Sequence, residues 1–137
     1  MWVFTKDGFL SAVQNNEDRH RMRVRARRRD HLSNAFPEHD KLIIDLQKSG
    51  AQFDYRWHLD IARGEWIDYL TDAALDVDYS SHAKEAMSGS DKPYYSAMLD
   101  VWSAMYRLQT GGVKEIDEFG WDDDSPVDPF GQGRLES

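Results

Sequence analysis

Arginine recurs at every second position in RHRMRVRARRRD, residues 19–30, which is the most concentrated charge in the chain. Met22, Val24 and Ala26 stand between the arginines. Because successive side chains of a β-strand point to opposite faces, this alternation predicts a half-buried strand with guanidinium groups along one face. Such a row could follow the phosphates of single-stranded RNA or DNA. The candidate anion-binding residues are Arg21, Arg23, Arg25 and Arg27, and Arg29 continues the row.

Internal pairing is the alternative use of these arginines. Asp45, Asp54 and Asp60 occupy alternating positions in two later segments. A neighbouring strand that turned these carboxylates toward the arginines would neutralise them across the ladder. The net charge of −8 also opposes a general attraction to nucleic acid. Internal pairing is therefore favoured, and binding of RNA or single-stranded DNA is the alternative.

Carboxylates gather in the later part of the chain. Residues 37–137 hold nine Lys/Arg against twenty-one Asp/Glu, a net charge of −12. One group recurs at helical spacing and another stands beside a tryptophan near the C-terminus. Together they are the predicted partner-binding residues: Asp68, Asp72, Asp76, Trp121, Asp122, Asp123 and Asp124. Acidic side chains interleaved with aromatic ones suit docking on a basic groove, either a partner's or the arginine row itself.

These charges support one leading functional hypothesis, a small non-catalytic interaction protein that docks on a basic protein partner by charge complementarity. A regulator, or a phage-type inhibitor that mimics nucleic acid on its binding surface, is a concrete form of it. An anti-defence or mobile-element protein would act in this way. Binding of RNA or single-stranded DNA through the arginine strand is the first alternative.

Motifs for catalysis or cofactor binding are scarce. His58 with Asp54 and Asp60 is the best metal-like group, but Arg56 stands between them and repels a cation. The chain has no glycine-rich phosphate loop and no G-x-S-x-G elbow. It also has no cysteine, which excludes disulfides, thiolate catalysis, iron–sulfur clusters and Cys-ligated zinc. We therefore predict no metal, cofactor or catalytic residue; an enzyme with an unrecognised carboxylate and histidine site is the second alternative.

The arginine strand is predicted to belong to an antiparallel sheet. Residues 1–5 and 9–14 are β-prone runs joined by Lys6-Asp7-Gly8, a strong hairpin signal, and residues 21–27 add the third strand. Asp30 is placed to cap a helix over 31–36. Alternation then predicts strands over 41–47 and over QFDYRWHLDIA, residues 52–62, with Phe53, Tyr55, Trp57, Leu59 and Ile61 on one face.

The later segments have helical periodicity. From Arg63 the apolar residues recur at three- and four-residue spacing, which predicts a helix that buries Trp66, Ile67, Leu70, Ala73, Ala74 and Val77. A short helix follows near 78–87. Pro93 begins a long helix that ends at Gly111-Gly112 and turns inward Tyr94, Met98, Val101, Trp102, Met105 and Leu108.

The predicted fold class is therefore α+β. A four- to five-stranded antiparallel sheet carries two or three helices on one face, and a ferredoxin-like arrangement is allowed. Residues 1–110 are predicted to form a single domain. Residues 111–137, rich in Asp, Gly and Pro but also in aromatic residues, are predicted to be a flexible acidic tail.

Several short motifs resemble a widespread group of small bacterial proteins of unknown activity. They are the opening MW…GF-x-S-x-V, the VRAR of residues 24–27 followed by Leu32, the DYRW of residues 54–57, Asp78-Tyr79 with Lys84, and Val101-Trp102. The SSHAK segment departs from the pattern. The resemblance implies one compact domain over 1–108 and no activity. No apolar run approaches a transmembrane span and the N-terminus lacks the features of a signal peptide, so a cytoplasmic location is expected.

Overall fold

The computed structural model describes residues 1–50, 52–77 and 91–111. The chain divides into two compact units, Met1–Ser96 and Ala97–Ser137, with the boundary inside helix α4 (Lys92–Thr110). The sheet lies entirely in the first unit. One domain over 1–110 stays a prediction, and so does the tail, because 112–137 and the short helix expected near 78–87 lie outside the described residues.

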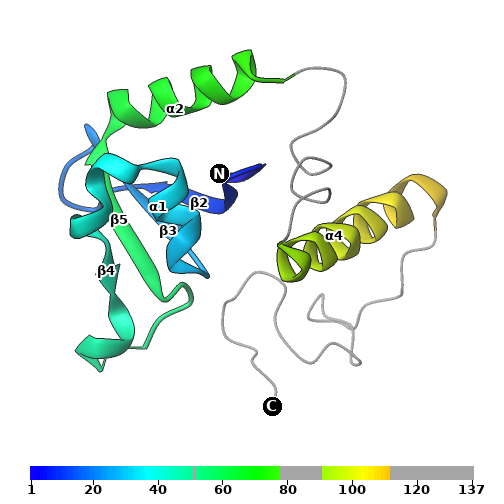
Figure 1. The fold of residues 1–137 in the computed structure, drawn as a ribbon, viewed down its shortest axis with the longest axis horizontal. Coiled ribbons are helices and arrows are strands. Elements are labelled where there is room, and N and C mark those ends of the chain that lie inside the picture. Colours follow the sequence, from blue (N-terminus) through cyan, green and yellow to red (C-terminus); the bar gives the residue numbers. More distant parts are fainter. Residues whose placement is uncertain (51, 78–90, 112–137) are drawn as a thin grey trace. The chain divides into compact units, whose positions relative to one another are not determined.

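A five-stranded antiparallel sheet confirms the predicted α+β class. Its strand order is β1-β2-β3-β5-β4 (Figure 1). The strands are β1 (Trp2–Thr5), β2 (Gly8–Gln14), β3 (Arg21–Ala26), β4 (Ile44–Asp45) and β5 (Trp57–Ala62). The first three form a meander, so the order of elements differs from the β-α-β-β-α-β of a ferredoxin-like fold.

The β1–β2 hairpin forms as predicted, and its turn depends on Gly8. This glycine has a φ of 141°, which side-chain-bearing residues rarely adopt. It also lies against the ring of His31, so that a Cβ built on it would come within 2.1 Å of the imidazole Cγ. The imidazole Nδ1 accepts a hydrogen bond from the Phe9 N–H at 3.2 Å, which holds the ring in place.

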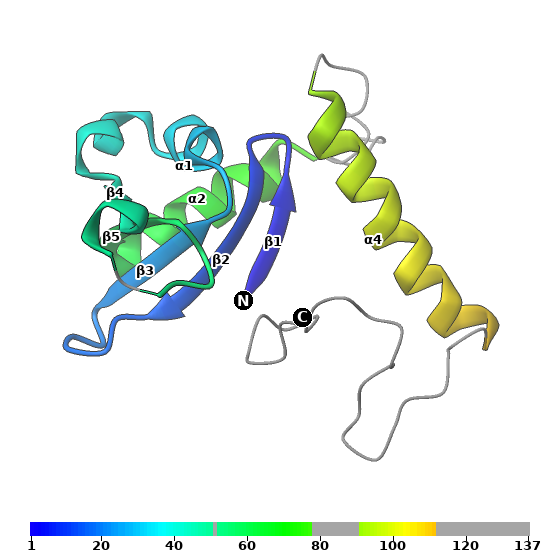
Figure 2. The same cartoon turned by 90° about the horizontal axis from the view of Figure 1, so that it is seen from below.

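The core lies between one face of the sheet and helices α1 (Arg29–Ala35) and α2 (Arg63–Leu75) (Figure 2). The sheet supplies the odd-numbered apolar residues of β5 and the even-numbered ones of β2 and β3, and the helical segment supplies Leu32, Phe36 and Trp66. The buried cluster comprises Leu10, Ala12, Met22, Val24, Ala26, Leu32, Phe36, Leu59, Ile61 and Trp66. Burial of this apolar surface is the main stabilising term, and it leaves the arginines on the opposite face of the sheet.

The segment between α1 and β5 differs from the prediction. The strand expected over 41–47 is mostly two 3-10 helices, η1 (Pro37–Leu42) and η2 (Leu46–Ser49), on either side of the two-residue β4. Pro37 begins η1, where its missing N–H costs nothing. The predicted Asp30 cap is also wrong: α1 begins at Arg29, Arg28 is the N-cap residue, and the Asp30 carboxylate pairs with Arg28.

Helices α2 and α4 bury less of their apolar surface than predicted. In α2, Trp66 is buried, but Ile67 and Leu75 are exposed, as is Val77 just beyond the helix. In α4, Tyr94 and Met98 are buried, whereas the predicted inward residues Trp102, Met105 and Leu108 are exposed. Among the described residues, no helix is both long and apolar enough to cross a membrane.

Candidate functional site

The arginine row of β3 is paired within the sheet. Arg23 stands opposite Asp60 of β5 in the ladder, and its Nε and Nη2 donate to the two carboxylate oxygens at 2.9 and 3.1 Å. This contact lowers the pKa of Asp60. Arg21 donates to the Asp60 carbonyl oxygen at 3.1 Å. Asp60 was among the predicted partners of the row, and internal pairing is confirmed for Arg23.

At the other end of the row, Arg25 and Arg27 both lie over the ring of Tyr55. The guanidinium carbons of Arg25 and Arg27 lie 4.6 and 4.3 Å from the centre of its ring, within the range of cation–π contacts. Arg27 also approaches the Asp54 carboxylate at 3.6 Å, and Arg25 donates to the Ser11 hydroxyl at 2.7 Å. The prediction that Tyr55 shares a face with Leu59 and Ile61 is wrong, because β5 begins only at Trp57.

The remaining predicted partners lie elsewhere. Asp45 binds Arg56 through both carboxylate oxygens, at 2.8 and 3.0 Å, rather than an arginine of β3. Arg29 belongs to α1 and pairs with Asp40 at 2.8 Å. His58 stands opposite Arg25 in the ladder; burial lowers its pKa, and the charges of Arg23 and Arg25 add to the effect. We name the surface carrying Arg21, Arg23, Arg25, Arg27, His58 and Asp60 the arginine face.

Carboxylates from two helical segments surround a second feature, a hollow of about 260 Å³. Predicted partner-binding residues Asp68 and Asp72 reach it from α2, one helical turn apart, together with Glu65. Glu38 reaches it from η1. Its lining, which we name the acidic hollow, consists of Ala35, Phe36, Glu38, Glu65, Asp68, Tyr69 and Asp72. Asp76, the third predicted aspartate, pairs with Lys6 at 2.8 Å.

The acidic hollow combines charge with an aromatic base. Phe36 is buried and packs against Tyr69, with ring centroids 5.1 Å apart. The Tyr69 hydroxyl is engaged by Thr5 at 2.8 Å and by Asp7 at 2.9 Å. The side chains of Glu38 and Glu65 are 60% and 41% exposed, so their carboxylates can be reached from solvent. Such a site suits a cation with an apolar stem.

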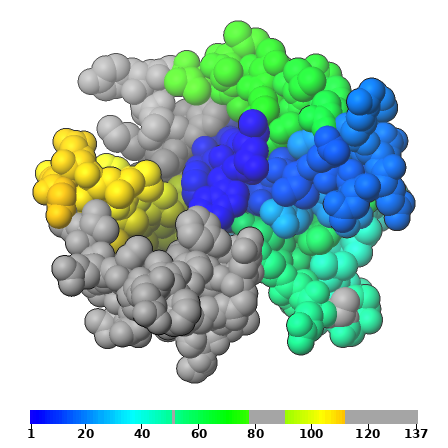
Figure 3. All heavy atoms as spheres, turned by 180° about the vertical axis from the view of Figure 1, so that it is seen from behind, coloured from blue at the N-terminus to red at the C-terminus, as the bar shows by residue number. Residues whose placement is uncertain are grey.

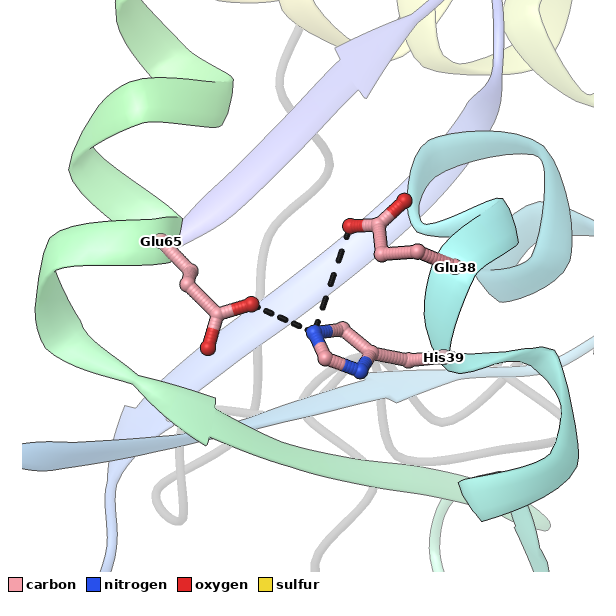
Figure 4. A group of neighbouring side chains, drawn as sticks. All are labelled: Glu38, His39 and Glu65. Carbon is pink, nitrogen blue, oxygen red and sulfur yellow. Dashed lines mark hydrogen bonds and ion pairs between the residues drawn. The ribbon is translucent and has the colours of Figure 1, made fainter.

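His39 lies beside the hollow between two of its carboxylates (Figure 4). Its Nε2 contacts Glu65 Oε2 closely and lies 4.0 Å from Glu38 Oε1. The contact with His39 lowers the pKa of Glu65, and a hydrogen bond from the Ala62 N–H to the other Glu65 oxygen, at 3.3 Å, lowers it further. Glu65 is thus anchored at the start of α2 and keeps its charge at neutral pH.

One nitrogen and two carboxylate oxygens also form a donor set that could hold a divalent cation. The ligand atoms of Glu38, His39 and Glu65 lie within 4.8 Å of one another. Nitrogen and oxygen ligands of this kind suit zinc and other first-row metals. The sequence pattern indicated His58 as the best histidine for such chemistry and gave no sign of His39, because Glu65 is 26 positions away from His39 and no motif spacing connects them.

The remaining predicted partner-binding residues, Trp121 and Asp122 to Asp124, lie outside the described residues. No family model, no curated protein and no solved structure matches the chain. The function is therefore inferred from the chemistry of the two surfaces.

Proposed function

We propose that the protein is a binding module whose acidic hollow receives an arginine or lysine side chain from a basic protein partner. The observation that carries the proposal is the hollow itself, with four carboxylates around a base of Phe36 and Tyr69. The carboxylates would pair with the cation, and the rings would cover its aliphatic stem or stack on a guanidinium plane.

The distribution of charge favours the acidic hollow, rather than the arginine face, as the surface that binds a basic protein partner. Carboxylates already engage arginines at the arginine face, whereas the hollow is lined by Glu38, Glu65, Asp68 and Asp72, of which Glu38 and Glu65 lie close to His39. Incompletely neutralised negative charge steers a basic partner toward the surface and fixes its orientation. Trp121 and Asp122 to Asp124 would extend the contact if they reach the same partner.

A titration of labelled arginine-rich and lysine-rich peptides of about nine residues tests the proposal. We expect saturable binding that weakens as salt rises from about 50 to about 500 mM, because exposed charge pairs are screened. The arginine peptide should bind more tightly, since its planar guanidinium matches a carboxylate bidentately and stacks on rings. Binding that is indifferent to salt would contradict charge-driven docking.

The matched variants remove two charges each and preserve side-chain shape. Asp68→Asn/Asp72→Asn removes charge from the hollow, and Glu17→Gln/Asp18→Asn removes it from the exposed turn between β2 and β3. Two exposed pairs contribute about 1–2 kcal/mol, so the first variant should bind roughly five- to thirtyfold more weakly. The second should bind almost as wild type does. Equal losses in the two variants would mean that net charge, rather than the hollow, attracts the peptide.

A further inference from the structure

The arginine face continues into a group of aromatic side chains that the proposed function does not use. Trp2 and Phe4 of β1 and Phe9 of β2 form this aromatic group. Phe4 and Phe9 stack with centroids 4.7 Å apart, and Trp2 meets Phe9 edge-on at 5.7 Å. The register places Trp2 opposite Ser11 and Ser11 opposite Arg25, so these residues share one face of the sheet.

The aromatic group is connected to the arginines through Tyr55. Phe9 lies 6.3 Å from the Tyr55 ring, and the same ring is covered by Arg25 and Arg27. One surface therefore carries exposed and half-buried rings next to four guanidinium groups. Trp2 is 50% exposed, and the N-terminal strands lie at the surface of the molecule, in blue in Figure 3. A tryptophan ring that is half exposed leaves a large apolar surface in contact with water.

The charge on this surface is opposite in sign to that of the protein. Four arginines, Arg21, Arg23, Arg25 and Arg27, stand against two aspartates, Asp54 and Asp60, a surplus of two positive charges. Arg27 and Arg23 remain 52% and 37% exposed although they are paired. The face can therefore still donate hydrogen bonds to an anion.

We propose that the arginine face with its aromatic group binds single-stranded nucleic acid. Bases stack on Trp2 and on the Phe4–Phe9 pair, while the phosphates lie along Arg21, Arg25 and Arg27. Aromatic stacking requires unpaired bases, and this selects single strands over duplex. Helices α1 and α2 lie on the opposite face of the sheet, together with the acidic hollow, so most of the repulsive carboxylates lie across the sheet from the bound strand.

The test uses the full chain and fluorescein-labelled oligouridine and oligothymidine of about twelve nucleotides, with a duplex of the same length for comparison. Anisotropy is measured from about 50 to about 300 mM salt. We expect saturable binding of both single strands at low salt, weaker binding of the duplex, and a log–log salt slope of about −0.7 for each phosphate contacted. No saturable binding at the lowest salt, as expected if a protein covers this face, overturns the proposal, and so does equal affinity for duplex.

Three variants and a control separate stacking from charge. Trp2→Ala should weaken single-strand binding about fivefold or more with an unchanged salt slope, and Trp2→Phe should restore most of the affinity. Arg27→Glu should weaken binding and make the slope shallower by about 0.7 or more. Lys41→Glu, which changes the same charge on exposed η1, is the control and should behave nearly as wild type.

Circular dichroism and thermal unfolding check that each variant is folded. Trp2 and Arg27 are half exposed, so neither substitution opens the core. Losses that are the same for Lys41→Glu as for Arg27→Glu overturn the assignment of the surface, because net charge alone then explains the binding. A Trp2→Ala variant that binds as wild type does overturns the stacking role.

Discussion

Substitution of Gly8 by alanine is expected to be the most destabilising glycine replacement in the described chain. Two penalties coincide at this position. The φ of 141° is one that an L side chain rarely adopts, and the new Cβ would lie 2.1 to 2.6 Å from three atoms of His31. The imidazole cannot move away easily, because it accepts a hydrogen bond from the Phe9 N–H and packs against the ring of Tyr94 at 5.0 Å.

The magnitude follows from the two terms. A non-glycine residue in a sparsely populated backbone region costs about 1–3 kcal/mol, and overpacking a filled site costs about 1–3 kcal/mol. The sum is about 2–6 kcal/mol, a large part of the roughly 5–15 kcal/mol that stabilises a typical domain. Gly50 separates the terms, since its φ is 73° but an added Cβ meets nothing within 4 Å. Gly50→Ala should therefore cost only about 1–2 kcal/mol.

Gly64 is the third glycine to compare, and its substitution by alanine should stabilise the protein instead of destabilising it. It lies in the first turn of α2, has no positive φ and faces open space, so Gly64→Ala should stabilise the protein by up to about 1 kcal/mol. Urea unfolding of the three variants measures these differences directly. The decisive comparison is Gly8→Ala made in a His31→Ala background, where the steric term is absent. The reasoning fails if Gly8→Ala costs no more than Gly50→Ala, or if removal of the His31 ring leaves its cost unchanged.

Two further predictions concern buried polar groups. Burial lowers the pKa of His31 and His58 below the unfolded value of 6.5, so the unfolded chain takes up more protons and the free energy of unfolding should fall as pH drops from about 7.5 to about 5.5. Urea midpoints at both pH values test this, and the His58→Gln variant should lose less stability over this pH range than the wild type does. Greater stability at the lower pH would contradict the prediction. Tyr69→Phe removes the hydroxyl that joins α2 to Thr5 and Asp7, and should cost about 1–2 kcal/mol in the same assay. The exposed control Tyr106→Phe should cost almost nothing, and equal losses would mean that the Tyr69 hydrogen bonds contribute little.

Local sequence patterns were sufficient to predict most strands of the sheet. The Asp7-Gly8 turn, the alternation of β3 and the alternation of β5 each depend on neighbouring residues, and they predicted the sheet and Asp60 as one of three possible partners of the arginine row. That Asp60 pairs with Arg23 depends on the register, which the sequence did not define. The strand expected over 41–47 failed because the 3-10 helix that begins at Pro37 continues to Leu42, and only Ile44 and Asp45 then pair with β5. Alternation shows that a segment could form a strand, but not whether a neighbouring strand pairs with it. Exposed Ile67 and Val77 show that helical periodicity defines an apolar stripe but not how much of it the sheet covers.

The acidic hollow could be predicted only in part. Helical spacing brought Asp68 and Asp72 together, because three- and four-residue steps share one side of a helix. Glu38 and His39 come from η1, at positions for which the sequence predicted neither helix nor strand, and their approach to Glu65 depends on how η1 lies against α2. The aromatic base has a similar origin, since Tyr69 was not among the residues expected to face inward. Tertiary packing, rather than any motif, assembled this site.

The order of strands also has a consequence for how the molecule folds. Strands β1, β2 and β3 pair with their neighbours in sequence, whereas β5 pairs with β3 across a separation of 31 residues, from Ala26 to Trp57. Closing this long loop costs more chain entropy than forming the meander, so we expect the meander to form early and β5 to join late. Until it does, Arg23 has no Asp60 beside it. The meander, residues 1–26, holds five Lys/Arg against three Asp/Glu, so until β5 joins it is a mildly cationic, aromatic sheet inside an acidic chain.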